Sequence, residues 1–403
     1  MTNLFAPLTG PLTKALSGPN RVYLFAILGV LALFGGYTAL WLQSAGALRA
    51  AIDTAITTEQ AHGNDVTYEG LTVGGFPYRL EITVDQPLLV RRTAGGERLA
   101  AARLIGHAAP VNPRHIIIRA EGPFTLHYTK QSTDGRPGEA RVKTGLADTV
   151  LAGIFLRDQD IDRFELEIEG FRGYDEPDTG AALLPARGDD ASRTAQLRFT
   201  RLGFFTRPHQ PLSASSDTSK TERPVGDYEA GEGFDVALRI DGLERESLAS
   251  PLLGNRIDRL LIDTHLREIE SLAAFAAALA ASHTEALQGW ALDEGSVGLR
   301  RAELSLEGLD LMARGALALE PNGHLRGQIM AEAIGIDTVF DRLVAQNVLE
   351  PQAANVLNRW IGILSAVQCE AGRTCAPLRF DRGGLFLVIP VLGPQRVSDL
   401  PPL

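Results

Sequence analysis

The stretch Val22–Leu42, VYLFAILGVLALFGGYTALWL, decides where the rest of the chain folds, because it carries no charged side chain. A helix of this length reaches about 31 Å, which matches the bilayer hydrocarbon core of about 30 Å. Its backbone polar groups are all satisfied within the helix, so nothing opposes insertion. We therefore predict a transmembrane helix over residues 22–42.

The flanks of this span indicate its orientation. Lys14 and Arg21 are the only charged residues before it. Positive residues favour the cytoplasmic side, so we expect residues 1–21 in the cytoplasm and the C-terminal body in the periplasm. The protein is then a single-pass protein of the cell inner membrane. Cleavage as a signal peptide after Ala47 is the alternative, but the apolar run exceeds the usual length of about 7–15 residues.

Two small residues in the span, Ala32 and Gly36, lie four positions apart. This spacing lets transmembrane helices approach closely, so it indicates a homodimer through the spans.

Composition narrows the class of partner. The chain has 403 residues and a formal net charge of −10, and only four of its 39 basic residues are lysines. No basic stripe alternates with aromatic residues, so we expect no nucleic-acid partner. The residues after the span suffice for one large domain or two ordinary domains.

The two cysteines, Cys369 and Cys375, lie in the segment QCEAGRTCAP. A redox pair normally has the spacing Cys-x-x-Cys, and a metal site needs ligands that this segment does not supply. In an oxidising periplasm a small disulfide loop is favoured. We predict a Cys369–Cys375 disulfide.

Alternating apolar and polar residues predict strands in most of the body. The alternation on both sides of Gly74-Gly75-Phe76-Pro77 is typical of a β-hairpin with one buried face, and it recurs near 116–118, 124–128, 164–168, 197–199 and 234–240. Strands that follow strands predict antiparallel pairing. The predicted fold class is α+β and β-dominated, with a transmembrane helix followed by antiparallel β-hairpins and a few packed helices.

Helical periodicity marks a stalk helix over 43–63 and helices near 270–289, 337–348 and 351–366. Residues 207–232 are rich in Pro, Ser and Gly and predict a linker. This linker divides an N-terminal β-rich half, 64–206, from a C-terminal α+β half, 233–403. A second irregular stretch is expected over 173–190, and Pro321-Asn322-Gly323 predicts another hairpin turn.

The segment Leu385-Phe386-Leu387-Val388-Ile389 is apolar throughout. Such a strand needs cover on both faces or a lipid-like partner. We take Leu385, Leu387 and Ile389 as a candidate apolar groove, with ordinary core as the alternative.

One acidic segment matches the spacing of a calcium-binding loop, with Asp158, Asp160, Asp162 and Glu169 at its liganding positions. The sixth position is Arg163, where the calcium loop needs glycine, and residues 164–168 alternate as a strand does. An acidic turn between two strands is therefore favoured over a calcium site.

No catalytic motif can be recognised. The eight histidines form no His-Glu-x-x-His pair, and nucleophile elbows, phosphate-binding loops and dinucleotide fingerprints are absent from the sequence. We predict no catalytic, cofactor-binding or metal-ligating residue, no cofactor, and a protein that is not an enzyme. Carboxylates dispersed in sequence leave a periplasmic hydrolase as an alternative.

Three segments carry a resemblance to a family: LTVGGFPYRL from Leu71, RGALALEPNGHLRG from Arg314, and FDRGGLFLVIP from Phe380 with the final Leu400-Pro-Pro-Leu. With the N-terminal span, they resemble domain-of-unknown-function family 2125 of Gram-negative inner-membrane-anchored proteins. The resemblance implies no site residue, because its motifs are turns and glycines. The architecture is also loosely similar to that of AsmA-like envelope proteins, which implies a role with lipids.

These observations favour a non-catalytic, membrane-anchored periplasmic protein that handles envelope lipid. A periplasmic scaffold that binds envelope proteins is the alternative.

Overall fold

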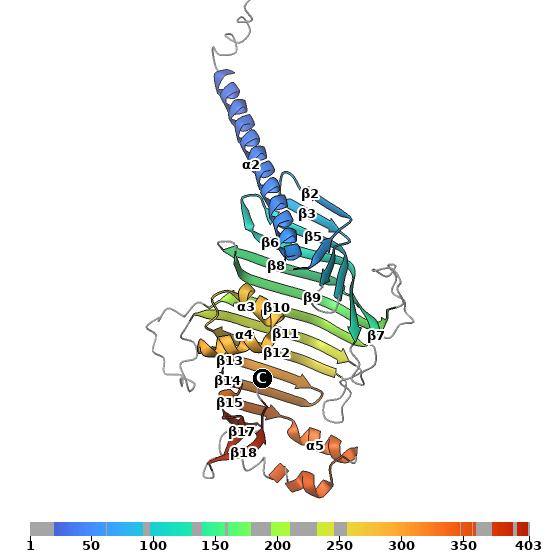
Figure 1. Cartoon of the computed structure of the whole chain (residues 1–403), viewed down its shortest axis with the longest axis vertical. Coiled ribbons are helices and arrows are strands. Elements are labelled where there is room, and N and C mark those ends of the chain that lie inside the picture. The colour runs from blue at the N-terminus through green and yellow to red at the C-terminus, as the bar shows by residue number, and fades with distance from the viewer. Residues whose placement is uncertain are drawn as a thin grey trace, which may run out of the picture.

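Helix α2 (Asn20–Ala61) projects from one end of a long β-sheet in the computed structural model (Figure 1). The structure describes residues 20–61, 63–91, 97–130, 139–157, 160–178, 195–209, 232–245, 256–346, 348–356, 358–359, 373–389 and 393–401.

The predicted span and stalk are one continuous helix of 42 residues. No proline interrupts residues 20–61, so the backbone hydrogen bonds continue past the predicted boundary at residue 42. This helix is long and apolar enough to cross a membrane. Its second half packs on the sheet, where Trp41, Ala45 and Leu48 contact a cluster that includes Leu80 and Ala108.

The sheet has 18 strands, and every described pairing is antiparallel, as the sequence predicts. The first nine strands are β1 (Asp65–Thr67), β2 (Gly70–Gly74), β3 (Leu80–Asp85), β4 (Leu88–Arg91), β5 (Glu97–Ala109), β6 (Asn112–Lys130), β7 (Glu139–Leu146), β8 (Thr149–Arg157) and β9 (Asp160–Pro177). The other nine are β10 (Leu197–Pro208), β11 (Gly233–Arg245), β12 (Arg256–Arg267), β13 (Ser296–Leu306), β14 (Leu309–Leu319), β15 (Leu325–Ile334), β16 (Thr374–Asp381), β17 (Gly384–Ile389) and β18 (Gly393–Asp399).

The strands pair in the main order β2-β3-β5-β6-β8-β9-β10 and then consecutively to β18. Strand β10 pairs with β11, so both predicted halves contribute to one sheet. The predicted linker begins too early, because β10 extends to Pro208; residues 210–231 lie outside the described part of the chain. The irregular stretch predicted from Gly173 is wrong at its start, because pairing with β7 carries β9 to Pro177.

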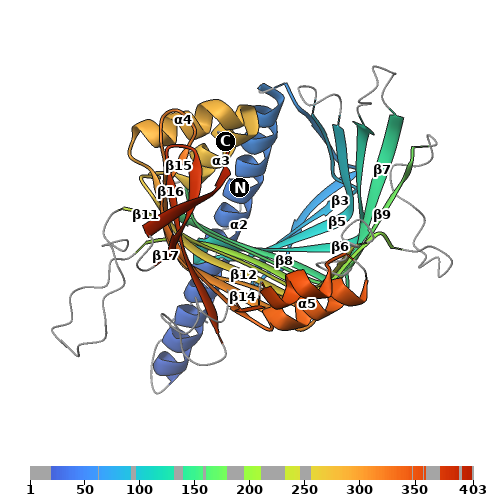
Figure 2. The same cartoon turned by 90° about the horizontal axis from the view of Figure 1, so that it is seen from below.

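A side arm branches from this main run through β1, β4 and β7. Strand β6 pairs with β8 over its first half and with β7 over its second half. Between the halves, Gly122 has φ +80°, and a Cβ there would lie 2.7 Å from the Cβ of Ala102. Glycine permits this bend, and the sheet as a whole curves into a trough (Figure 2).

Helices α3 (Leu272–Ala281), α4 (His283–Leu292) and α5 (Ile336–Ala345) pack on the sheet among the described residues. Where one helix was predicted over 270–289, there are two, α3 and α4. Ser282 ends the first and caps the second by accepting a hydrogen bond from the backbone N–H of Glu285. Helix α5 begins one residue before the helix predicted over 337–348 and ends three residues before its predicted end. In the helix predicted over 351–366, residues 351–356 and 358–359 are helical.

The hydrophobic clusters lie where these helices meet the sheet. Helices α3 and α4 pack around Phe234, Trp290 and Leu319. Helix α5 packs through Val339 and Leu343 at the opposite ends of some of the same strands.

Candidate functional site

One face of the sheet is apolar along almost its whole length. Directly paired residues of antiparallel strands point to the same side, so the register defines rows of side chains that cross the sheet. The first row runs from β2 to β16 through Val73, Ile82, Gly106, Ile118, Ala152, Leu166, Phe204, Leu238, Ile262, Ala302, Ala313, Ala331 and Ala376.

Two parallel rows flank it on the same face. One runs through Leu71, Val84, Leu104, Ala120, Val150, Ile168, Leu202, Ile240, Leu260, Leu304, Leu311, Ala333 and Thr374. The other runs from β3 to β17 through Leu80, Ala108, Ile116, Ile154, Phe164, Thr206, Val236, Thr264, Leu299, Gly315, Ile329, Leu378 and Leu387. We call these three rows the apolar face; they contain no charged residue.

The few hydroxyl groups on the central apolar face bond to the backbone. The Oγ1 of Thr206 accepts a hydrogen bond from the N–H of Phe164 at 3.1 Å, and the Oγ1 of Thr264 donates to the carbonyl of Val236, also at 3.1 Å. Both hydroxyls are therefore satisfied without turning toward the open side of the sheet.

Burial along the apolar face depends on the helices. Leu80, Ile82 and Ala108 are buried near α2. From β8 to β12, the members of the three rows are half-buried, with the exception of the two buried threonines. Since α3 and α4 pack on this same face and lie on the concave side of the trough, the apolar face is the concave one (Figure 2). Its centre is an apolar surface that the described residues leave partly uncovered.

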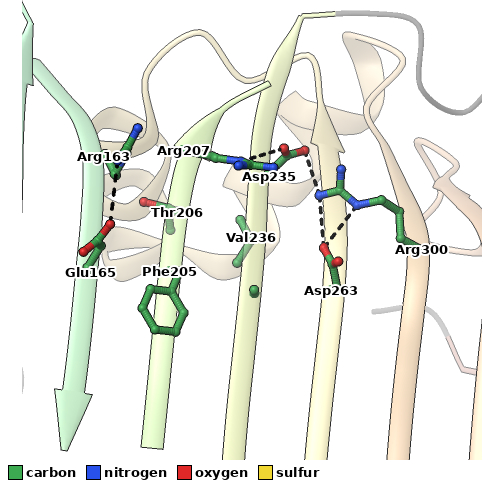
Figure 3. Close-up of a pocket in the computed structure, with 10 residues that line it drawn as sticks. Arg163, Glu165, Phe205, Thr206, Arg207, Asp235, Val236, Asp263 and Arg300 are labelled. Atoms are coloured by element: carbon green, nitrogen blue, oxygen red, sulfur yellow. Dashed lines mark hydrogen bonds and ion pairs between the residues drawn. The ribbon is translucent and has the colours of Figure 1, made fainter. Parts of the chain in front are cut away.

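The opposite face carries charge. The same strands place Glu165, Arg239 and Asp263 there, opposite in direction to the apolar rows. An open pocket of about 530 Å³ lies on this face, with Arg163, Arg207 and Arg300 in its lining (Figure 3).

At this pocket, Asp235 on β11 is the centre of a polar cluster. Its Oδ1 lies 2.9 Å from an Nη of Arg300 and 3.1 Å from the Nδ1 of His209, and its Oδ2 accepts from the Nε of Arg207 at 3.2 Å (Figure 3 shows the arginines). Burial alone raises the pKa of the Asp235 carboxyl, but the hydrogen bonds from Arg300, His209 and Arg207 outweigh it and lower that pKa. The carboxylate is therefore ionised and paired.

His265 completes the cluster from β12. Its side chain is 1 % exposed, and no described residue forms a hydrogen bond with either ring nitrogen, although Nδ1 lies 3.4 Å from the Oδ1 of Asp235. Burial, and then the neighbouring His209, lower the pKa of His265, so the ring is neutral.

Donor atoms of His209, Asp235 and His265 all lie within 4.8 Å of one another, which is a geometry that a metal ion could use. Two guanidinium groups already contact both oxygens of Asp235, however, and they oppose a further positive charge there. We interpret the cluster as a buried polar network that joins β10, β11, β12 and β13. Sequence patterns do not reveal this cluster, because His209 falls in the predicted linker and only strand register brings it to His265.

The predicted site residues lie as follows. Leu387 belongs to the apolar face, at the end that is furthest from α2. Leu385, two residues earlier on β17, points to the same face and pairs with Phe380. Leu385 and Leu387 are half-buried, and the side chain of Ile389 lies outside the description. The candidate groove thus joins a much larger apolar surface that no single segment reveals.

The described residues leave the remaining candidates untested. Cys375 is buried in β16, while Cys369 lies outside the described residues, so the disulfide stays a prediction. Ala32 and Gly36 are exposed on α2, and the dimer also stays a prediction. In the acidic segment, β9 begins at Asp160, which pairs with Arg157 of β8, and Asp162 and Glu169 lie within β9, whereas Asp158 lies outside the described residues.

The family model described as "Uncharacterized protein conserved in bacteria (DUF2125)" matches residues 41–395. The chain belongs to this family. The match extends from Trp41 on α2 into β18, so it includes the second half of the helix, strands β1 to β17 and the first residues of β18. No curated protein and no solved structure matches the chain. The likeness to AsmA-like proteins stays a prediction.

Proposed function

We propose that this protein is anchored in the bacterial inner membrane, extends its body into the periplasm and binds the acyl chains of membrane lipids along the apolar face. The observation that carries the proposal is the continuity of that face, whose first strands lie against α2 and whose last member is Leu387.

Acyl chains suit this surface for physical reasons. A lipid tail needs an extended apolar contact without directional groups, and each of the three rows crosses thirteen strands without a charged residue. Each methylene removed from water contributes about 0.8 kcal/mol. A chain that contacts several strands therefore gains several kcal/mol, while the charged opposite face stays in water.

The partial exposure of the central rows supports a binding surface over ordinary core. A core position is normally closed by a second layer, whereas Leu166, Leu238 and Ile262 remain half-buried. Exposed apolar surface of this extent in a soluble body marks a site for an apolar partner.

Site-specific photo-crosslinking in intact cells tests the proposal. A photoreactive amino acid replaces Leu238 on the apolar face, and in the matched control it replaces Ala237, its neighbour on the opposite face of β11. With lipids labelled through their phosphate groups, we expect a labelled adduct at position 238 and none at position 237.

Adducts with protein alone at position 238 would overturn lipid binding in favour of the scaffold function. Equal lipid labelling at both positions would also contradict the proposal, because contact would then not depend on the apolar face.

A further inference from the structure

The β2–β3 turn docks on the part of α2 that is apolar enough to lie in a membrane. The Phe76 ring forms T-shaped pairs with Trp41 and Phe34, with ring centroids 5.4 Å and 6.1 Å apart, respectively. The Nε1–H of Trp41 donates to the carbonyl of Arg79 at 3.0 Å, and the hydroxyl of Tyr37 donates to the carbonyl of Pro77. The turn is therefore fixed at a definite height along the helix.

The position of the turn along α2 can be compared with the thickness of the bilayer hydrocarbon core. Counted from Val22 at about 1.5 Å per residue, Phe34 lies about 18 Å and Trp41 about 29 Å along the helix. The hydrocarbon core is about 30 Å thick. A helix that enters the core near Val22 thus holds the β2–β3 turn beside the outer part of the opposite leaflet.

The β5–β6 turn lies slightly further along the same helix. The Oγ of Ser44 donates to the carbonyl of Pro110 at 3.2 Å. Ser44 lies about 33 Å from Val22 by the same measure, just past the hydrocarbon core and at the level of the lipid head groups. The two turns therefore approach the bilayer at adjacent depths.

The side chains at these two turns suit that environment. Tyr78 is 89 % exposed, Val111 is 74 % exposed and Phe76 is 42 % exposed. Exposing the apolar surface of these three side chains to water is unfavourable in free energy, and burying it in a membrane would remove this cost. Tyrosine and other aromatic residues favour the membrane–water interface. The guanidinium of Arg79 pairs with Glu81, and its side chain is 60 % exposed, so its remaining N–H groups are suited to a lipid phosphate.

We infer that the β2–β3 and β5–β6 turns insert Phe76, Tyr78 and Val111 into the periplasmic leaflet, so that the apolar face opens directly onto lipid tails. This inference rests on the proposed membrane anchor and lipid binding. Its consequence is a lipid entrance: Leu71 and Val73, at the first ends of two apolar rows, lie on the β-hairpin whose turn contacts the bilayer.

A depth measurement tests the inference on the full-length chain in nanodiscs of phosphatidylethanolamine and phosphatidylglycerol. In a background with Cys369→Ser and Cys375→Ser, a single cysteine at position 78 or 111 carries an environment-sensitive fluorophore. Position 397 is the matched control, because Val397 is also exposed and apolar but lies on β18, at the far end of the sheet. Lipids with brominated acyl chains serve as the quencher.

We expect emission from positions 78 and 111 to shift to the blue and to lose most of its intensity in brominated nanodiscs, while position 397 keeps both. Quenching at position 78 no stronger than at position 397 would overturn the inference. The lipid adduct at position 238 is measured separately, so a failed entrance with retained lipid binding is distinguishable from failure of the proposed function.

Hydroxyl-radical footprinting of the unsubstituted chain gives a second reading that needs no cysteine variant. Without a bilayer contact, Tyr78 should be oxidised faster than the half-buried Tyr174. Insertion predicts the reverse order in nanodiscs. Faster oxidation of Tyr78 there would contradict insertion.

Discussion

Replacing Trp41 with alanine should loosen the β2–β3 hairpin without unfolding the rest of the sheet. Trp41 is 8 % exposed, packs on Leu80 and Ala108, meets the Phe76 ring edge-on and donates one hydrogen bond. A lost hydrogen bond costs about 1 kcal/mol, an edge-to-face ring pair about 1 kcal/mol, and truncation of a buried aromatic in total about 3–5 kcal/mol. We take about 4 kcal/mol as the loss.

Local unfolding of the hairpin breaks these contacts, so its free energy should fall by that amount. At 1.4 kcal/mol per tenfold change, amides of β2 and β3 should exchange hydrogen roughly a thousandfold faster. Hydrogen–deuterium exchange mass spectrometry on the full chain in nanodiscs measures this directly. Trp41→Phe retains the ring and loses the hydrogen bond, so it should accelerate exchange only about fivefold.

Strands β13 to β15 serve as the internal control, because they do not contact Trp41. Unchanged exchange in β2 and β3 of Trp41→Ala would show that Trp41 does not stabilise the hairpin. Equally faster exchange in β13 to β15 would show that the loss of stability is not confined to the hairpin.

Four other outcomes are expected. Asp235→Asn should lower the free energy of unfolding by about 3 kcal/mol in denaturant titrations, because the charge-assisted bonds to two arginines and His209 are lost; an unchanged midpoint would contradict the network. The pKa of His265 is lower in the folded protein than its ordinary value of 6.5, so the free energy of unfolding should fall as pH falls below about 6.5. In thermal melts, the melting temperature of His265→Gln should decrease less with falling pH than that of the unsubstituted protein. The lowered pKa of Asp235 adds a further loss as pH falls below about 3.8, toward the folded value. Cys369 and Cys375 should resist alkylation until reduced, with the bond contributing about 2 kcal/mol; two free thiols in protein from intact periplasm would exclude it. Alkaline phosphatase fused after the body should be active, whereas an active cytoplasmic reporter there would reverse the predicted orientation.

Local patterns predicted several elements correctly. The Gly74-Gly75 hairpin and the Pro321-Asn322-Gly323 hairpin are β2–β3 and β14–β15, and the helical pattern predicted near 270–289 contains α3 and α4. These elements depend on residues that are close in sequence, such as turn glycines and the serine cap at Ser271. Antiparallel pairing also follows from strands that succeed one another without intervening helices.

What could not be predicted depends on register. Strand β5, with the sequence ERLAAARLIGHAA, is rich in alanine and has no clear alternation, so its strand form comes from pairing with β3, β4 and β6. Each alternating segment predicts one apolar side, but only the pairing of Leu166 with Phe204, and of Phe204 with Leu238, aligns those sides into one surface. The cluster of His209, Asp235 and His265 arises in the same way, because register brings the neighbouring ends of β10, β11 and β12 together.

The order of the strands also sets the length of the sheet. Strands β1, β4 and β7 belong to the side arm, so fifteen of the 18 strands succeed one another in the main run. Because hydrogen-bonded strands are spaced at about 4.8 Å, this run spans at most about 70 Å away from the anchor, with the strands crosswise to that direction (Figure 1). Length in such a molecule can change only in steps: one added hairpin extends it by about 10 Å, and one lost hairpin shortens it equally. If the apolar face binds lipid tails as proposed, the number of hairpins therefore sets how far from the membrane a tail can stay in contact with the protein.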